Sequence, residues 1–352
     1  MKILIVGAGV SGICLAHTFL EKGLAFKLID SGNNVSSKIA AGMINPMVFR
    51  KMLKTWRGDD LIPYLKDFYP KIEKRIDAKF FFPRKIRRVF STEEERANWK
   101  IRSSDIDYRN YIFPLEETTE SPEYVIEKYG SGWVNSPGYI ESKIFMHENQ
   151  RFLRENGLLT LEAFNFTEFD PEKLSYRGES YTHIIFAEGY KMIENPYFNY
   201  LPLRHTKGEV LTVRSEQLIK SEILNRKCFV LPTNDELYKI GATFAWNTTD
   251  TTITEEAKSE LMEQYRNLSS APVEIVNQEA GIRPTVADRR PMLGEHPKHK
   301  GIFIFNGMGT KGYMIAPFFA GVFYSYLFSG KALDAEVDIK RFFKKHYPDQ
   351  TS

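Results

Sequence analysis

Cysteine is scarce in this 352-residue sequence, which contains only Cys14 and Cys228. The two lie far apart, so neither a C-x-x-C pair nor a zinc-binding spacing occurs. This excludes a disulfide framework and leaves no candidate metal site. The pattern is typical of a protein in a reducing compartment, and we therefore expect a cytoplasmic location.

An excess of charge of either sign is also missing, because 48 Lys and Arg are balanced by 45 Asp and Glu, a net charge of +3. So small a charge does not by itself imply a nucleic acid or an anionic membrane as partner. A basic run between Arg50 and Arg57 surrounds Trp56. Such runs are more often solvated surface than nucleic-acid patches. We expect no nucleic-acid partner, with tRNA as the open exception.

No hydrophobic run is long enough to span a membrane. The most apolar stretch, 313–328, has about sixteen residues and includes Pro317 and Gly321. It is shorter than the ~20 residues that the hydrocarbon layer requires, so we expect a buried helix and no membrane partner. Lys2 precedes an apolar stretch, as in a secretory signal, but three glycines interrupt that stretch. We therefore expect no signal.

The first thirty residues have the order strand, glycine turn, helix, strand, acid. Residues 3–6 form an apolar run with β-branched side chains, which suits a buried parallel strand. Apolar residues then recur at helical intervals until a second run, 26–29, ends at Asp30 and Ser31. This order predicts a dinucleotide-binding unit, in which the Asp30 carboxylate accepts hydrogen bonds from a ribose hydroxyl pair. The same carboxylate would repel a ribose phosphate, so NADP is not the expected ligand.

Three glycines at G-x-G-x-x-G spacing predict the phosphate cradle of this unit. Gly7 lets the chain turn sharply, Gly9 lets the backbone approach a pyrophosphate, and Gly12 lets the helix lie close to the strand. The helix start at Val10 and Ser11 offers unpaired N–H groups and a partial positive charge to the phosphates. We expect all five residues to bind the cofactor.

A loop of small residues follows. Ala40, Ala41 and Gly42 would let the backbone come close to a flat ligand, and Pro46 prevents a helix there. This A-A-G-x-x-x-P loop after a glycine-rich unit resembles the D-amino-acid oxidase and glycine oxidase group of flavoproteins. The resemblance implies that the loop runs past the flavin ring and that Ala41, Gly42 and Met43 bind the cofactor. The alternative is a plain turn of small residues.

The buried apolar run before position 187 ends in Ala187, Glu188 and Gly189. In the resembled family a strand that ends in A-x-G lies against the cofactor, which implies that Ala187 and Gly189 bind it. Glu188 departs from the small or hydroxyl residue that is common there. Because a carboxylate would repel a pyrophosphate, we expect this side chain to point away.

The C-terminal quarter carries the most specific part of the resemblance. It contains G-I-R-P at 281–284, then D-R-x-P-x-x-G, an apolar run, G-M-G-x-K-G and an apolar helix that opens with A-P. This order is most similar to the oxidase domain of the bifunctional enzymes that modify the tRNA wobble uridine, with glycine oxidase second. Arg283 matches the family arginine that holds the substrate carboxylate, since a planar guanidinium fits a carboxylate in two hydrogen bonds. The alternative is a surface arginine.

The G-M-G-x-K-G segment should present backbone N–H groups to the flavin. The resemblance implies cofactor contacts from six consecutive residues: Gly307, Met308, Gly309, Thr310, Lys311 and Gly312. Negative charge develops on the ring when two electrons arrive. A helix start and the Lys311 ammonium would stabilise this charge and raise the reduction potential. We therefore assign Arg283 and Lys311 as the catalytic pair.

These patterns predict an α/β protein in which a Rossmann-like FAD-binding domain is interleaved with a smaller α+β substrate domain built on an antiparallel sheet. The predicted FAD-binding segments are 1–78, 138–200 and 280–352, and the substrate-domain segments are 79–137 and 201–279. Two short apolar runs on either side of Pro83 predict a hairpin or an edge pair.

The resemblance implies a flavoprotein enzyme with non-covalent FAD, because neither cysteine lies where relatives link their flavin. It also implies oxidation of a C–N bond in a small-molecule amino acid or secondary amine by hydride transfer. Two alternatives stay open, namely oxidation of a modified tRNA wobble uridine and a flavin-binding module without turnover. An NAD-dependent dehydrogenase is less favoured, because no nicotinamide-side motif is present. The substrate, the electron acceptor and the oligomeric state are not given by the sequence.

Overall fold

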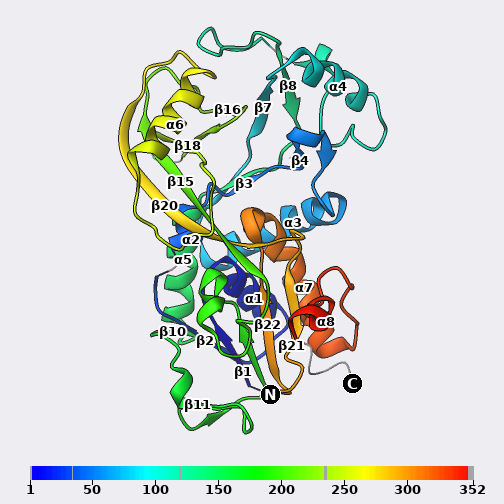
Figure 1. The fold of residues 1–352 in the computed structure, drawn as a ribbon, viewed down its shortest axis with the longest axis vertical. Helices are drawn as coiled ribbons and strands as arrows, with labels where there is room; N and C mark the ends of the chain where they lie inside the picture. Colours follow the sequence, from blue (N-terminus) through cyan, green and yellow to red (C-terminus); the bar gives the residue numbers. More distant parts are fainter. Residues whose placement is uncertain (1, 34, 119, 234–235, 348–352) are drawn as a thin grey trace.

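The computed structural model describes residues 2–33, 35–118, 120–233 and 236–347, and it shows an elongated molecule with two lobes (Figure 1). Parts of the predicted domain segments, residues 1, 34, 119, 234–235 and 348–352, lie outside the described residues. Each lobe is built around one large sheet, and these sheets together confirm the predicted α/β class.

The lower lobe in Figure 1 contains a six-stranded sheet with strand order β10-β2-β1-β14-β22-β21. Five of its strands are parallel, and β21 pairs antiparallel with β22 at one edge. The strands are β1 (Ile3–Val6), β2 (Phe26–Asp30), β10 (Leu159–Leu161), β14 (His183–Phe186), β21 (Met292–Glu295) and β22 (Ile302–Asn306).

Both faces of this sheet are covered, as parallel sheets require. Side chains alternate between the faces of β1. Ile3 and Ile5 belong to the core shared with the large helices, whereas Leu4 and Val6 pack in a second core with aromatic residues such as Phe198. This burial on both sides explains why the strand is an unbroken apolar run in the sequence.

The upper lobe contains an eight-stranded sheet with order β19-β15-β18-β17-β16-β7-β8, and β20 pairs with β15. Its pairs are antiparallel except β7 with β16. The strands are β7 (Lys85–Val89), β8 (Ser131–Val134), β15 (Leu203–Arg214), β16 (Glu222–Asn225), β17 (Phe229–Pro232), β18 (Leu237–Gly241), β19 (Ala245–Trp246) and β20 (Glu274–Val286). The strand β20 runs through the predicted domain boundary at residue 280. The division into two domains stays a prediction.

The predicted pairing of the two runs around Pro83 is wrong. β6 (Phe81–Phe82) pairs with β9 (Gly138–Ile140), whereas β7 joins the large sheet through β8 and β16. The two runs have better partners far away in the sequence, which local pattern cannot reveal. The remaining short strands are β3 (Met43–Ile44), β4 (Met47–Val48), β5 (Leu53–Lys54), β11 (Phe169–Asp170), β12 (Ser175–Tyr176) and β13 (Glu179–Ser180).

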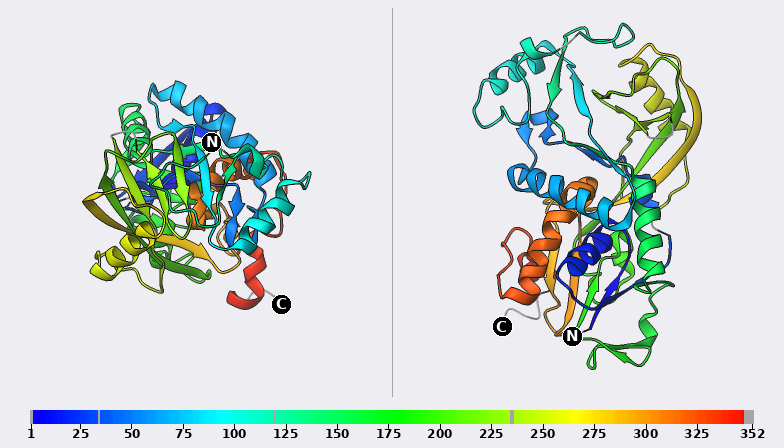
Figure 2. Two further views of the ribbon diagram at one scale, coloured as in Figure 1. Left: turned by 90° about the horizontal axis from the view of Figure 1, so that it is seen from above. Right: turned by 180° about the vertical axis from the view of Figure 1, so that it is seen from behind.

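Eight α-helices lie within the described residues, and α3 crosses the middle of the molecule between the lobes (Figure 2). They are α1 (Val10–Glu21), α2 (Val35–Ile39), α3 (Gly58–Ile76), α4 (Glu93–Ser103), α5 (Ser142–Glu155), α6 (Glu255–Arg266), α7 (Gly312–Ser329) and α8 (Phe343–His346). The 3-10 turns are η1 (Phe49–Lys51), η2 (Leu115–Glu117), η3 (Phe166–Glu168), η4 (Gly189–Glu194), η5 (Gly309–Lys311) and η6 (Ile339–Phe342).

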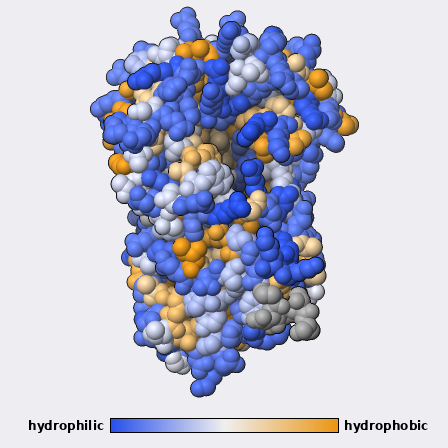
Figure 3. Space-filling view, in the orientation of Figure 1, coloured by the Kyte–Doolittle hydropathy of each residue, from blue (hydrophilic) through white to orange (hydrophobic). Residues whose placement is uncertain are grey.

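The apolar helix α7 lies in the core of the lower lobe, as predicted. It packs against both α1 and α3, and its Ala316, Phe319 and Phe323 are fully buried. Across the described ranges, no helix combines the length and the apolar character needed to cross a membrane. The face shown in Figure 3 is mostly hydrophilic, with hydrophobic residues in small scattered groups.

The turn between β1 and α1 depends on two of its glycines. Gly7 has a φ of +106°, and a Cβ atom there would lie 2.5 Å from the carbonyl oxygen of Ala187. A Cβ atom on Gly12 would lie 1.8 Å from the carbonyl oxygen of Gly7. The backbone of α1 therefore packs directly on the turn, as the spacing of these glycines predicts.

We expect Gly12→Ala to lower the free energy of unfolding by about 1–3 kcal/mol, because the added methyl group forces α1 away from the turn. Urea denaturation measures this change. The control is Glu21→Ala at the exposed end of the same helix, which loses only a surface ion pair with Lys71. Equal stability of the two variants would contradict the close packing at Gly12.

Candidate active site

One cavity of about 500 Å³ joins the two lobes, a volume typical of ligand sites. Segments from both ends of the chain line it. The predicted site residues found in its wall are Gly7, Gly9, Val10, Ser11, Asp30, Ser31, Ala41, Gly42, Met43, Ala187, Gly189, Arg283, Met308, Gly309, Thr310, Lys311 and Gly312. Gly12 and Gly307 do not line it: Gly12 packs under the turn, and Gly307 precedes the lining segment with a φ of +74°.

The Asp30 carboxylate lies at the end of β2 and is almost fully buried. Its Oδ2 accepts a hydrogen bond from the Ala8 N–H at 2.6 Å, and its Oδ1 accepts one from the Gly32 N–H at 2.6 Å. These bonds fix the carboxylate beside the glycine turn. Asp30 lines the cavity, where a carboxylate is an acceptor for the hydroxyl groups of a ligand.

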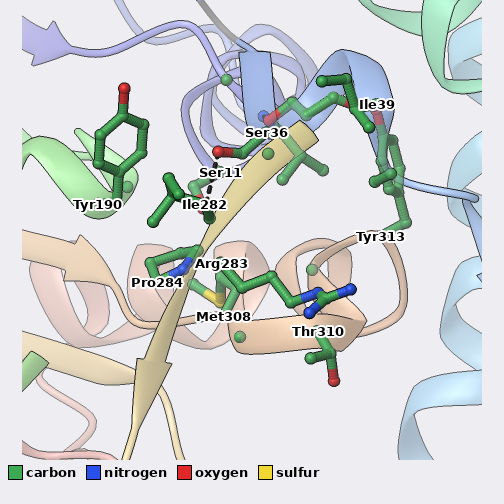
Figure 4. A pocket seen from close by; sticks show the side chains of 18 of the residues that line it. Ser11, Ser36, Ile39, Tyr190, Ile282, Arg283, Pro284, Met308, Thr310 and Tyr313 are labelled. Atoms are coloured by element: carbon green, nitrogen blue, oxygen red, sulfur yellow. Dashed lines mark hydrogen bonds between the residues drawn. The ribbon is translucent and has the colours of Figure 1, made fainter. Parts of the chain in front are cut away.

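The helix α2 connects the glycine turn to β20 and α7. The Ser37 hydroxyl accepts a hydrogen bond from the Val10 N–H at 3.1 Å, and the Ser36 hydroxyl donates one to the Ile282 carbonyl at 2.5 Å (Figure 4). The Tyr313 hydroxyl donates to the Ser37 carbonyl at 2.8 Å. Sequence reasoning missed Ser36 and Ser37, which lie in a polar segment without a recognisable motif.

The small-residue loop lies close to β9. Gly42 has a φ of +68°, and a Cβ atom on it would lie 1.9 Å from the Ile140 carbonyl oxygen. The Gly42 carbonyl accepts a hydrogen bond from the Ile140 N–H at 2.9 Å. Glycine is therefore required here by backbone packing, and the neighbouring Ala41 and Met43 form part of the cavity wall.

Lys311 lies at the N-terminal end of α7. Its ammonium donates hydrogen bonds to the Asn45 carbonyl at 3.0 Å and to the Thr55 hydroxyl. Burial lowers the pKa of Lys311 to about 8, and within the described residues no carboxylate lies within ion-pair distance. An ammonium has three donors, so one remains for an anion in the cavity.

Arg283 extends from β20 over the segment that carries Thr310 (Figure 4). Its Nη1 donates to the carbonyls of Lys207 at 3.3 Å and Thr243 at 3.1 Å. The Phe244 ring centroid lies 4.2 Å from the guanidinium carbon. Burial lowers the pKa of Arg283 to about 10, which leaves it charged at neutral pH. No carboxylate of the described chain pairs with it, so its remaining donors can bind an anion.

Two glycines leave space above the sheet for side chains of the cavity. Gly208 lies beneath Arg283, and Gly241 lies beneath Phe229. A Cβ atom on Gly208 would lie 1.9 Å from Nη2 of Arg283, and one on Gly241 would lie 2.7 Å from the Phe229 ring. Arg283 and Phe229 therefore lie flat over neighbouring strands. From the sequence these glycines are only turn and packing positions. Their role here depends on contacts between distant strands.

We compared the chain with known proteins. The FAD dependent oxidoreductase (DAO) family profile matches residues 2–323. Glycine oxidase of Pseudomonas aeruginosa is 23% identical over 349 residues, which cover 90% of this chain and 92% of that protein. The crystal structure of glycine oxidase from Geobacillus kaustophilus superimposes with a TM-score of 0.77 at 19% identity, covering 97% of this chain and 98% of the other.

A third relative is larger. The tRNA 5-methylaminomethyl-2-thiouridine biosynthesis bifunctional protein of Hahella chejuensis is 20% identical over 346 residues. The match covers 90% of this chain but 55% of that protein.

The fold and the site together define the class of this protein. It is an α/β protein that binds a dinucleotide, and a second sheet covers the cofactor cavity. The wall fits FAD, since Gly7, Gly9 and Ser11 line the cavity at the start of α1, where a helix N-terminus can bind a pyrophosphate. The profile match covers most of the sequence, so the chain belongs to the family of FAD-dependent oxidoreductases.

The variant Gly208→Ala tests whether the space above Gly208 positions the Arg283 guanidinium. The new methyl group would displace the guanidinium, so we expect the FAD-loaded protein to bind a simple carboxylate such as benzoate at least about tenfold more weakly. Perturbation of the flavin absorbance reports this binding. The matched control is Gly281→Ala on the paired strand position, where a Cβ atom meets nothing closer than 3.4 Å. Equal losses in both variants would argue against the role of Gly208.

Proposed function

We propose that this protein oxidises a C–N bond of an amino acid or a carboxylate-bearing secondary amine. The observation that supports this most directly is the position of Arg283. Its guanidinium lies in the cavity that fits FAD, and no carboxylate of the described chain neutralises it. A planar cation of this kind binds a carboxylate through two parallel hydrogen bonds.

In this proposal the predicted cofactor residues divide along the cavity. Asp30 and Ser31 bind the ribose of the adenosine half, and the turn at Gly9 and the start of α1 bind the pyrophosphate. The small-residue loop and the segment 308–312 would hold the ring, since both line the cavity. The start of α7 and the Lys311 ammonium then lie where negative charge develops.

FAD supplies the hydride acceptor when it is bound. Arg283 fixes the substrate carboxylate and so holds the α-carbon in one orientation. Hydride would pass from the α-carbon to the bound FAD, and the nitrogen lone pair would form the C=N bond of an iminium ion, which water would hydrolyse to a carbonyl compound and the released amine. The amine reacts in its neutral form, so we assign no protein base.

The aromatic residues near Arg283 support a substrate larger than glycine. Phe229 and Phe244 both line the cavity, and neither offers a hydroxyl group to a small polar substrate. In relatives that handle small amino acids, the resemblance places a tyrosine at the position of Phe229. We therefore propose that the amine carries an apolar substituent.

Non-covalent FAD binding is supported by the state of the two cysteines. Both are buried. Burial raises the pKa of the Cys228 thiol to about 12 and the pKa of the Cys14 thiol further still. The thiolate is the form that attacks other groups, so neither cysteine is suited to a link with the flavin. The free thiols also accord with the cytoplasmic location that we propose.

Oxidation of a modified tRNA is a second candidate, favoured by the match to the bifunctional protein. The basic run predicted as a possible nucleic-acid patch gives it little support. Arg57 pairs with Asp60 and Asp334, and Lys54 pairs with Asp59. A salt-sensitive affinity for tRNA would support this candidate. Turnover of free amino acids without tRNA affinity would remove it.

The decisive experiment is anaerobic mixing of the FAD-loaded protein with a panel of amino acids and N-alkyl amino acids. Loss of the visible flavin absorbance, followed by peroxide or a reduced artificial acceptor when an oxidant is added, would establish the activity. No loss of absorbance with any amine would favour the flavin-binding module without turnover.

Arg283→Ala should raise the KM for carboxylate-bearing amines by roughly 10- to 100-fold, the worth of a charge-assisted hydrogen-bonded pair. Arg283→Lys should recover part of this loss, because it restores the charge but not the planar fork. Steady-state kinetics on both variants measure the effect. An unchanged KM in Arg283→Ala would rule out its role as the carboxylate anchor.

Lys311→Met should slow anaerobic flavin reduction by at least about tenfold, with little change in substrate affinity, because it removes a cation at the developing charge. The pKa of Lys311 is about 8, so Lys311 is charged below this pH and neutral above it. The difference between wild type and variant should therefore shrink as the pH rises through 8. Stopped-flow reduction measures it, with exposed Lys51→Met as the control. A difference that is the same at all pH values would contradict a role for the charge.

A further inference from the structure

Glu188 is an acidic residue in the wall of the cofactor cavity, and the proposed chemistry has no use for it. The residue lies between the last residue of β14 and the start of η4, and it is one of the residues that line the cavity. Carboxyl groups inside proteins are normally paired with cations. Glu188 therefore requires an explanation.

Its backbone adjoins the phosphate cradle. A Cβ atom on Gly7 would lie 3.3 Å from the Glu188 nitrogen and 2.5 Å from the Ala187 carbonyl oxygen. The end of β14 and the glycine turn are thus in contact. An anionic ligand on the turn at the start of α1 would lie beside this residue.

One oxygen of the carboxyl group already has a partner. The Asn195 side chain donates a hydrogen bond from Nδ2 to Oε2 of Glu188 at 2.6 Å, and Asn195 is fully buried. Its Oδ1 accepts the Tyr197 N–H at 2.9 Å, which fixes the orientation of the amide. Oε2 therefore acts as an acceptor, and Oε1 has no hydrogen-bond partner among the described residues.

Within the described ranges no cation lies within ion-pair distance of Glu188, although the charge of Lys191 acts to lower its pKa. Lys191 on the same turn bonds instead to the Ser31 hydroxyl at 3.3 Å, and Glu194 adds like charge. His205 on β15 contacts the Tyr190 carbonyl, while Arg283 on β20 and Asp30 after β2 line the cavity further along. Burial raises the pKa of Glu188 to about 8, so the carboxyl is mostly protonated at neutral pH.

We propose that Glu188 is a cofactor-binding residue that acts as a neutral carboxylic acid, donating a hydrogen bond from Oε1 to the diphosphate-ribose part of FAD. Its Oε2 meanwhile accepts from Asn195. A negative carboxylate at this place would repel the diphosphate, whereas a protonated one binds it. The holoenzyme therefore keeps this proton, and FAD affinity depends on pH.

The direction of this dependence follows from linkage. FAD binds the protonated form, so its dissociation constant should be constant at neutral pH. Above the pKa of the ligand-free protein it should rise by up to about tenfold per pH unit. The inference uses the FAD site alone and does not depend on amine oxidation, so failure of either proposal leaves the other standing.

The test is a fluorescence titration of the FAD-free full-length protein with FAD between pH 6.5 and 9.5. Wild type should lose affinity above about pH 8. Glu188→Gln keeps a neutral group of the same shape, so its affinity should match that of wild type at pH 6.5 and stay nearly constant to pH 9.5. The control Glu194→Gln, at an exposed neighbouring position, should retain the loss of affinity.

The pKa of Lys311 is lowered to about 8, so its charge changes over the same pH range. Glu188→Gln keeps Lys311, so a loss of FAD affinity caused by Lys311 would persist in this variant. A wild-type affinity that is constant with pH would overturn the proposal, as would an equal loss in Glu188→Gln. Infrared spectroscopy of the wild-type holoenzyme at pH 8.5 gives a second measurement that needs no variant. The C=O stretch of a protonated carboxyl should be present, and its absence would also overturn the proposal.

Discussion

The site depends on the short helix α2, which holds three distant parts of the chain together. Its two serines bind the start of α1, the β20 strand beside Arg283 and the Tyr313 hydroxyl of α7. Hydrogen bonds of this kind contribute only about 1 kcal/mol each, but here they set the relative positions of the glycine turn and Arg283. Through these bonds α2 links the upper sheet to the nucleotide-binding lobe beside the cavity.

The second constraint is electrostatic. Arg283 and Lys311 are partly buried cations without a carboxylate partner among the described residues, and burial lowers the pKa of both. An unpaired charge inside a protein costs several kcal/mol. That cost is offset when an anion enters, whether a substrate carboxylate or a ring that gains negative charge. Glu188 is the complementary case, because its raised pKa favours the neutral acid beside an anionic ligand.

Much of the fold could be predicted from local pattern. The strands of the first βαβ unit and the burial of α7 follow from periodicity and run length. The pairing of β6 and β7 could not, because each strand finds its partner far away in the sequence.

The candidate site likewise combines features that the sequence predicts with features that it does not. The glycine turn and Asp30 are recognisable because their spacing reflects one local geometry. Other features form only when separate strands and helices come together. These are the spaces above Gly208 and Gly241 and the hydrogen bond from Ser36 to Ile282. Glu188 departs from the family pattern in the sequence, but its hydrogen bond with Asn195 depends on the fold and could not be predicted.

The central claim is that both ends of the chain bind one FAD molecule, with Arg283 facing its ring. A crystal structure of the protein with FAD and a bound carboxylate tests this most directly. It should show the diphosphate on the turn at the start of α1, the ring beside residues 308–312 and the carboxylate on Arg283. A ring outside this cavity, or a carboxylate bound away from Arg283, would contradict the account.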